Sequence, residues 1–214
     1  MSEKKMVFVK AMSFAISERF GAIPCGYKHT FLIRHPAKVF RSYKTQTSNE
    51  SRGSIDNNNA HDNNGTSTKY KLTECQQLDE APGYFFKESY DLYRHVQETY
   101  DPHPIIIDAD DLQSNPGGLL KAYCDAVGIP FSDDLLRWDR SDDVTRTWKI
   151  RRILLQLHRL ADYTFLENAF SSYEFQKPLS SPNIVVRDLP EDIRQYVNFA
   201  MPFYEKMYKE RLTC

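Results

Sequence analysis

An arginine and a serine eight positions apart are the residues of this chain best suited to bind a ligand. Arg34 follows the short apolar run at residues 31–33, and Ser42 lies in the segment 36–44, which is expected to be helical. Pro36 suits the first position of that helix, because its missing N–H would have no partner there. A helix N-terminus beside a guanidinium group is suited to bind phosphate. The same residues also fit an ordinary strand–helix unit, in which Arg34 and Ser42 are surface residues.

A second cluster of chemically capable residues is acidic. Asp108, Asp110 and Asp111 follow the apolar run at 105–107. In one interpretation, Asp110 or Asp111 orders the loop by accepting hydrogen bonds from backbone N–H groups. In a second, the carboxylates bind magnesium for phosphoryl transfer. In a third, Asp108 and Asp110 are similar to the nucleophile and acid of haloacid-dehalogenase-type phosphatases.

The elements that must position these residues alternate between strands and helices. Strands are predicted at residues 5–10, 29–34 and 105–107, and helices at 13–20, 36–44, 82–99, 147–169 and 190–211. A further helix begins at Asn115-Pro116 and ends at Gly128. The pattern predicts an α/β protein with a parallel sheet flanked by helices.

Composition limits the classes of protein that the chain can represent. Its 214 residues predict one domain, 1–214, with a disordered Asn- and Ser-rich insertion at 45–70. Lysine and arginine number 28 against 29 acidic residues, so no bulk charge favours nucleic acid as a partner. No apolar run approaches the ~20 residues of a membrane span, and no signal peptide is evident. Four scattered cysteines fit free thiols, and together these features predict a cytoplasmic protein.

Several segments together resemble the sulfotransferases, in particular the short sulfotransferase-like proteins of the P-loop superfamily. They are residues 6–12, 29–43, 105–138 and the final helix around 202–208, so the resemblance covers most of the chain outside 45–80. It implies that Arg34 and Ser42 hold the 3′-phosphate of the co-substrate 3′-phosphoadenosine 5′-phosphosulfate. It also implies transfer of the sulfuryl group to an unknown small-molecule hydroxyl or amine, without a metal.

The resemblance identifies the catalytic residues less clearly. Lys10 is expected at the end of the first strand, facing the sulfuryl group. Many sulfotransferases have a histidine two positions after this lysine, where this chain has Met12, and the nearer relatives have an aspartate where it has Ala11. His29 and His35 are substitute candidates for the base at the same sheet edge. Both histidines are also compatible with a role in capping or packing.

The loop that cradles the 5′-phosphosulfate in sulfotransferases is not recognisable in this sequence. Such a loop directs several backbone N–H groups at one anion, and no early strand followed by a turn of this kind precedes residue 5. The chain is therefore expected to lack the N-terminal part of the fold. Two alternatives to an active sulfotransferase follow: an inactive remnant that binds nucleotide or a partner, and a magnesium-dependent phosphohydrolase that uses Asp108 and Asp110.

Overall fold

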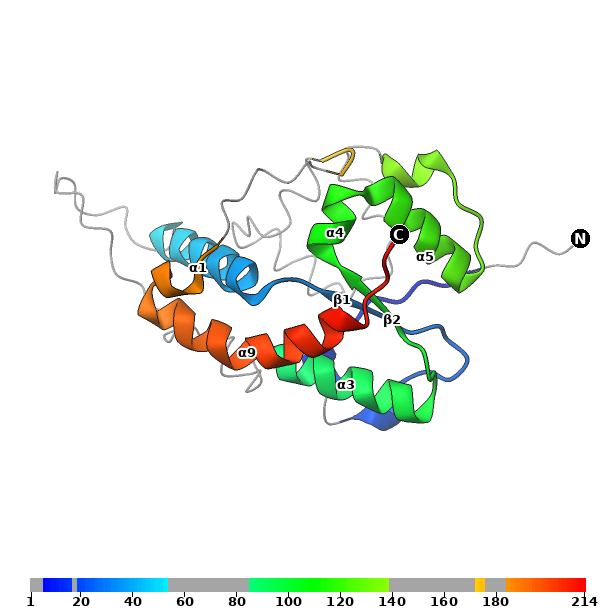
Figure 1. The fold of residues 1–214 in the computed structure, drawn as a ribbon, viewed down its shortest axis with the longest axis horizontal. Helices are drawn as coiled ribbons and strands as arrows, with labels where there is room; N and C mark the ends of the chain where they lie inside the picture. Colours follow the sequence, from blue (N-terminus) through cyan, green and yellow to red (C-terminus); the bar gives the residue numbers. More distant parts are fainter. Residues whose placement is uncertain (1–5, 17–18, 54–84, 139–171, 176–183) are drawn as a thin grey trace, which may run out of the picture.

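Two parallel strands form the centre of the molecule. The computed structural model describes residues 6–16, 19–53, 85–138, 172–175 and 184–214 (Figure 1). Strand β1 (Thr30–Ile33) pairs with β2 (Ile105–Asp108), with Thr30 opposite Ile105 and Ile33 opposite Asp108. The described part of the chain between the two strands includes two helices, which fits the long crossover that parallel strands need. The predicted α/β class with a parallel sheet is therefore confirmed.

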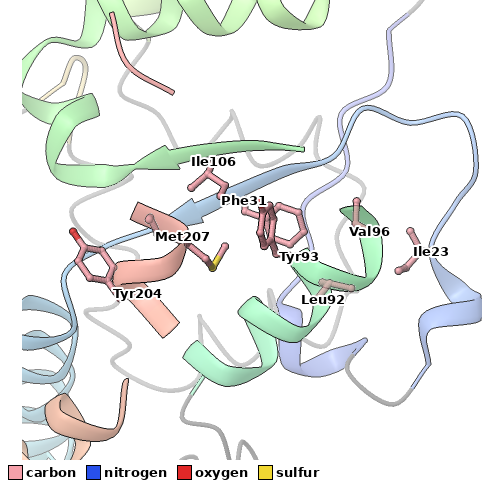
Figure 2. Packing of buried hydrophobic residues seen from close by; sticks show 9 residues of the cluster. Ile23, Phe31, Leu92, Tyr93, Val96, Ile106, Tyr204 and Met207 are labelled. Atoms are coloured by element: carbon pink, nitrogen blue, oxygen red, sulfur yellow. The ribbon is translucent and has the colours of Figure 1, made fainter. Parts of the chain in front are cut away.

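Helices α3 (Phe86–Thr99) and α9 (Glu191–Lys209) cover one face of this sheet. Phe31 and Ile33 point to this face from β1, and Ile106 points to it from β2. Figure 2 shows how the strands and the two helices meet in one apolar cluster. The buried members of the cluster are Ile23, Phe31, Ile33, Leu92, Tyr93, Val96, Ile106, Tyr204 and Met207. Burial of one such side chain stabilises the fold by about 1.5–3 kcal/mol.

Helix α1 (Pro36–Gly53) follows β1 and packs along α9 (Figure 1). Phe40, which is 1% exposed, lies against Phe86 and Tyr196, with ring centroids 5.6 Å apart in both pairs. The helix begins at the predicted Pro36 but continues beyond the predicted end at residue 44. The first part of the predicted insertion is thus helical, and residues 54–70 of it lie outside the described part of the chain.

Helices α4 (Ala109–Ser114) and α5 (Pro116–Val127) lie on the other side of the sheet (Figure 1). The Asn115 side chain caps α5 by accepting a hydrogen bond of 3.1 Å from the N–H of Gly118. A Cβ atom at Gly118 would lie 2.5 Å from Asn115 Nδ2, so this cap requires glycine there. Gly128 ends the helix with φ 72°, a left-handed conformation that glycine adopts without strain. Both predicted ends of this helix are confirmed.

Short 3₁₀ turns connect the larger elements. They are η1 (Ser13–Ala15), η2 (Phe20–Ala22), η4 (Asp133–Leu136) and η6 (Val186–Asp188). The first two replace the helix predicted over 13–20, and the helix predicted over 147–169 lies outside the described residues. Among the helices that the structure describes, none is both long and apolar enough to cross a membrane.

The prediction of a strand at residues 5–10 is wrong. Residues 6–10 have no strand conformation, and the side chains of Met6, Val7, Phe8 and Val9 are 59–81% exposed. Alternating apolar residues indicate that a segment can pair in a sheet, but a strand also needs a neighbour for its backbone groups. In the described sheet, β1 pairs with β2 and not with this segment.

Candidate functional site

Arg34 leaves the carboxyl end of β1 and extends toward helix α4. Its Nε donates to Asp110 Oδ1 at 3.2 Å, and its Nη2 donates to Gln113 Oε1 at 3.4 Å. The Arg34 side chain is 38% exposed, so solvent reaches its guanidinium group. The arginine at the predicted phosphate site is thus held by one charged and one amide partner and remains accessible to a ligand.

Lys38 joins this group from the first turn of α1. Its Nζ lies 3.0 Å from Asp110 Oδ2, the second oxygen of the carboxylate that Arg34 contacts. A lysine in the first turn of a helix is disfavoured by the helix dipole, and this turn contains no acidic residue to offset it. That misplaced charge is the sequence signal that could have identified Lys38, which sequence reasoning missed. We refer to these three residues as the Arg34–Lys38–Asp110 cluster.

Ser42 lies further along α1 and is exposed. Because Lys38 and Ser42 are four positions apart, they lie on the same helix face. Ser42 lies roughly 9 Å along the helix axis from Pro36 at 1.5 Å per residue. A ligand that contacts both Arg34 and Ser42 would therefore have to lie alongside the first two turns of α1.

His35 uses the backbone donors that the N-terminus of α1 would otherwise offer to an anion. Its Nδ1 accepts the N–H of Ala37 at 3.2 Å, and its carbonyl accepts the N–H groups of Lys38 and Val39 at 2.9 and 3.2 Å. Pro36 has no N–H. An anion here would be bound by the side chains of Arg34 and Lys38, and the expected contribution from free backbone donors is absent in the described structure of this turn.

The structure gives His35 a capping and packing role. Its ring packs edge-on against Tyr204, with ring centroids 5.4 Å apart. Burial lowers the pKa of His35 below its usual value, although Asp110 acts in the opposite direction. The interpretation of His35 as a cap is therefore confirmed, and its Nδ1 acceptor is already in use.

Asp108 organises the junction between β2 and α4. Its Oδ1 accepts the N–H groups of Asp110 and Asp111 at 2.8 and 3.2 Å, which caps α4. Its Oδ2 accepts a hydrogen bond of 3.1 Å from the hydroxyl of Tyr204, which Figure 2 shows turned away from the apolar cluster. Burial raises the pKa of Asp108, and these three hydrogen bonds oppose the rise. The prediction that Asp110 or Asp111 orders this loop is thus wrong, because Asp108 is the cap.

The other two carboxylates tie α4 to neighbouring elements. Asp110 pairs with Arg34 and Lys38, and Asp111 accepts from Arg211 Nε at 2.6 Å. Asp108 is only 1% exposed. This arrangement gives the phosphohydrolase interpretation no support, because the proposed nucleophile Asp108 is buried and its two oxygens accept three hydrogen bonds from within the chain. Within the described residues, no three His, Cys, Asp or Glu side chains form a possible metal site.

The two candidate catalytic residues lie elsewhere. Lys10 is exposed in the segment that forms no strand, so the structure does not place it at the carboxyl edge of the sheet. His29 precedes β1, whereas Arg34 follows it, which separates them by roughly 16 Å of extended chain. The prediction that His29 shares a sheet edge with Arg34 is wrong, because the two residues flank the strand at opposite ends.

His29 is a partly buried ring rather than a presented base. Both ring nitrogens are buried without a hydrogen-bond partner in the described structure, and the ring lies 5.9 Å from that of Tyr100. Burial lowers the pKa of His29, although Asp101 acts against this. These observations favour packing over proton transfer for His29.

The fold and the order of these elements agree with a comparison against known families. A sequence model of the sulfotransferase domain matches residues 92–211, more than half of the chain. The protein therefore belongs to the sulfotransferase domain family. The match includes β2, α4, α5 and α9, with Asp108, Asp110 and Tyr204. It begins after α1, so Arg34, Lys38 and Ser42 lie outside it.

A curated relative adds only a short similarity. A 36-residue stretch is 47% identical to branched-chain-amino-acid aminotransferase-like protein 2 of Arabidopsis thaliana, and it covers 17% of this chain. The chain thus spans only 6% of that protein's length. No solved structure matches the chain.

Proposed function

We propose that this sulfotransferase domain binds 3′-phosphoadenosine 5′-phosphosulfate and transfers its sulfuryl group to a small-molecule hydroxyl or amine. The observation that carries the proposal is the exposed guanidinium of Arg34 at the carboxyl end of β1, where parallel α/β sheets bind ligands. Arg34 would contact the 3′-phosphate through charge-assisted hydrogen bonds, and Ser42 would contact it from the exposed face of α1.

The proposed reaction depends on how the protein positions the reactants rather than on covalent catalysis. The acceptor oxygen or nitrogen attacks sulfur, the bond from sulfur to the 5′-phosphate oxygen breaks, and the acceptor proton passes to a base. The products are the sulfated acceptor and 3′-phosphoadenosine 5′-phosphate. Arg34 and Ser42 act at the far end of the donor, where they fix the nucleotide and leave its sulfuryl group free for in-line attack.

Calorimetric titration with 3′-phosphoadenosine 5′-phosphate tests the donor site. We expect binding by the wild type, and a loss of about 100-fold or more in Arg34→Ala, because a guanidinium–phosphate contact is charge-assisted and geometrically matched. Arg94→Ala is the matched control, since Arg94 forms an exposed pair with Glu98 on α3. Equal affinity of the wild type and Arg34→Ala for the nucleotide would remove the proposed site.

A second candidate function is nucleotide binding without transfer. The exposed position of Lys10, outside any strand, and the presence of Met12 where many sulfotransferases have a histidine favour it. A sulfation assay with radiolabelled donor and a panel of phenols, sterols and sugars separates the two functions. Turnover that disappears in Arg34→Ala supports transfer, whereas nucleotide binding without turnover on any acceptor supports the second candidate.

A further inference from the structure

The cluster formed by Arg34, Lys38 and Asp110 suggests how the proposed phosphate site behaves when no nucleotide is bound. We propose that the carboxylate of Asp110 occupies the position that the 3′-phosphate takes, and that Lys38 is a further phosphate-binding residue. Asp110 is then an internal competitor that sets the affinity of the site. This inference rests on the proposed function, because it concerns the same nucleotide and the same arginine.

The geometry of the cluster supports a single anion position between two cations. The two oxygens of Asp110 are divided between Arg34 Nε at 3.2 Å and Lys38 Nζ at 3.0 Å. Two oxygens of a phosphate are spaced like the two oxygens of a carboxylate, so a phosphate in this position could accept from the same two donors. It would also carry more charge than the carboxylate, which favours the exchange.

Two cations of the cluster share the single carboxylate of Asp110. Arg34 and Lys38 meet at the positive end of the α1 dipole, and the structure places the Asp110 carboxylate against both of them. The neighbouring ring of His35 accepts the N–H of Ala37 at Nδ1, so it adds no positive charge to the cluster. A doubly charged phosphate would therefore offset two positive side chains that one carboxylate balances only in part.

Asp110 is free to move without dismantling the fold. The cap of α4 is provided by Asp108, which accepts the backbone N–H of Asp110, so the Asp110 carboxylate is not needed for that helix. Its side chain is 24% exposed, and that of Lys38 is 26% exposed. Solvent can therefore take the place of either partner as the carboxylate leaves.

Substitution of Asp110 by asparagine tests the competition. We expect Asp110→Asn to bind 3′-phosphoadenosine 5′-phosphate about fivefold more tightly than the wild type, since it removes a partly exposed ion pair that binding must break. Asp125→Asn is the matched control, because Asp125 forms an exposed pair with Lys121 on α5 and its removal changes net charge equally. Weaker or unchanged binding in Asp110→Asn, or an equal gain in Asp125→Asn, overturns the competition.

Adenosine 5′-monophosphate distinguishes a local effect from a general one, because it lacks the 3′-phosphate. The gain in Asp110→Asn should appear with 3′-phosphoadenosine 5′-phosphate and be absent with this second nucleotide. A gain of similar size with both nucleotides overturns the assignment of Asp110 to the 3′-phosphate position. Binding of neither nucleotide by the wild type or the variant contradicts both the inference and the proposed function.

Lys38→Met tests the new phosphate ligand separately. We expect its affinity for 3′-phosphoadenosine 5′-phosphate to fall about tenfold, the loss of one charge-assisted hydrogen bond. Lys121→Met is its control on α5. A loss in Arg34→Ala together with wild-type affinity in Lys38→Met would leave the proposed function intact and overturn the role of Lys38. Thermal unfolding of each variant, followed by circular dichroism, confirms that the compared proteins are folded.

Discussion

The two strand–helix junctions at the carboxyl edge of the sheet are both capped by a side chain, but they have opposite electrostatics. After β1, the neutral ring of His35 caps α1, and Arg34 and Lys38 stand beside it. After β2, the buried carboxylate of Asp108 caps α4, and two further acids follow in the first turn. Each junction satisfies its backbone donors from within the chain, so the difference lies in the side chains.

This difference separates a structural junction from a binding one. At α4 the carboxylates favour the helix dipole, and they link α4 to α1, to Tyr204 and to Arg211. At α1 the positive residues oppose the dipole, an arrangement that costs stability in the absence of an anion. The charges at the α4 junction thus suit its helix, whereas the charges at the α1 junction rely on Asp110 of the α4 junction as their counter-charge.

The largest expected effect concerns the stability of the two junctions. Asp108→Ala should lower the free energy of unfolding by about 3 kcal/mol, because it removes the cap of α4 and leaves the buried Tyr204 hydroxyl without a partner. His35→Ala removes only a cap and should cost about 1 kcal/mol. Urea denaturation measures both changes. Equal losses of unfolding free energy in Asp108→Ala and His35→Ala would contradict the proposed difference between the two junctions.

Asp108→Asn sharpens the same test. Asparagine keeps an oxygen for the N–H groups of Asp110 and Asp111, so it should cost about 1 kcal/mol or less. A loss as large as that of Asp108→Ala would show that the negative charge, and not the hydrogen bonding, stabilises the α4 junction.

A smaller effect is expected when α1 is capped by a carboxylate, as α4 is. His35→Asp places a carboxylate cap beside Arg34, where it would compete with a bound phosphate. We expect affinity for 3′-phosphoadenosine 5′-phosphate to fall about tenfold, a free-energy change of about 1.4 kcal/mol. His35→Asn keeps an uncharged cap and should bind nearly as well as the wild type. Calorimetry on both variants would contradict the comparison if the two losses were equal.

Local features of the fold were predictable from sequence because they depend on neighbouring residues. The apolar runs that became β1 and β2, and the start of α1 at Pro36, follow from local composition and backbone chemistry. The cap at Asn115 and the stop at Gly128 are equally local. Each of these features is caused by residues that lie within a few positions of it in the sequence.

Features that depend on a distant partner were not predictable. The exposed segment at residues 6–10 has the alternation of a strand, but the local sequence does not show whether another strand will pair with it. The three acids after β2 were recognised as a group, yet their roles depend on Tyr204, Arg211 and Arg34, which are distant in sequence. Lys38 had a local signal in its place in the first turn of α1, but the role of its charge depends on Asp110 at the other junction.

The smallest expected effect is a difference in how the two junctions respond to pH. The pKa of His35 is lowered in the folded protein, mainly by burial, so its contribution to stability is complete above the unfolded value of 6.5 and is lost as pH falls below it. Thermal unfolding between about pH 7.5 and 5.5, which spans the ordinary histidine pKa, should show a shallower decline in His35→Asn than in the wild type.

Asp108 should respond in the opposite direction. Burial raises its pKa above the ordinary value of 3.8, so its ionised form costs stability at neutral pH, and this cost disappears as pH falls through the raised pKa. The stability of the wild type relative to Asp108→Asn should therefore increase as the solution is acidified, while its stability relative to His35→Asn decreases. Parallel pH profiles for the two variants would show that the caps do not differ in this way. Opposite slopes would show directly that one junction is built on a buried acid and the other on a neutral base.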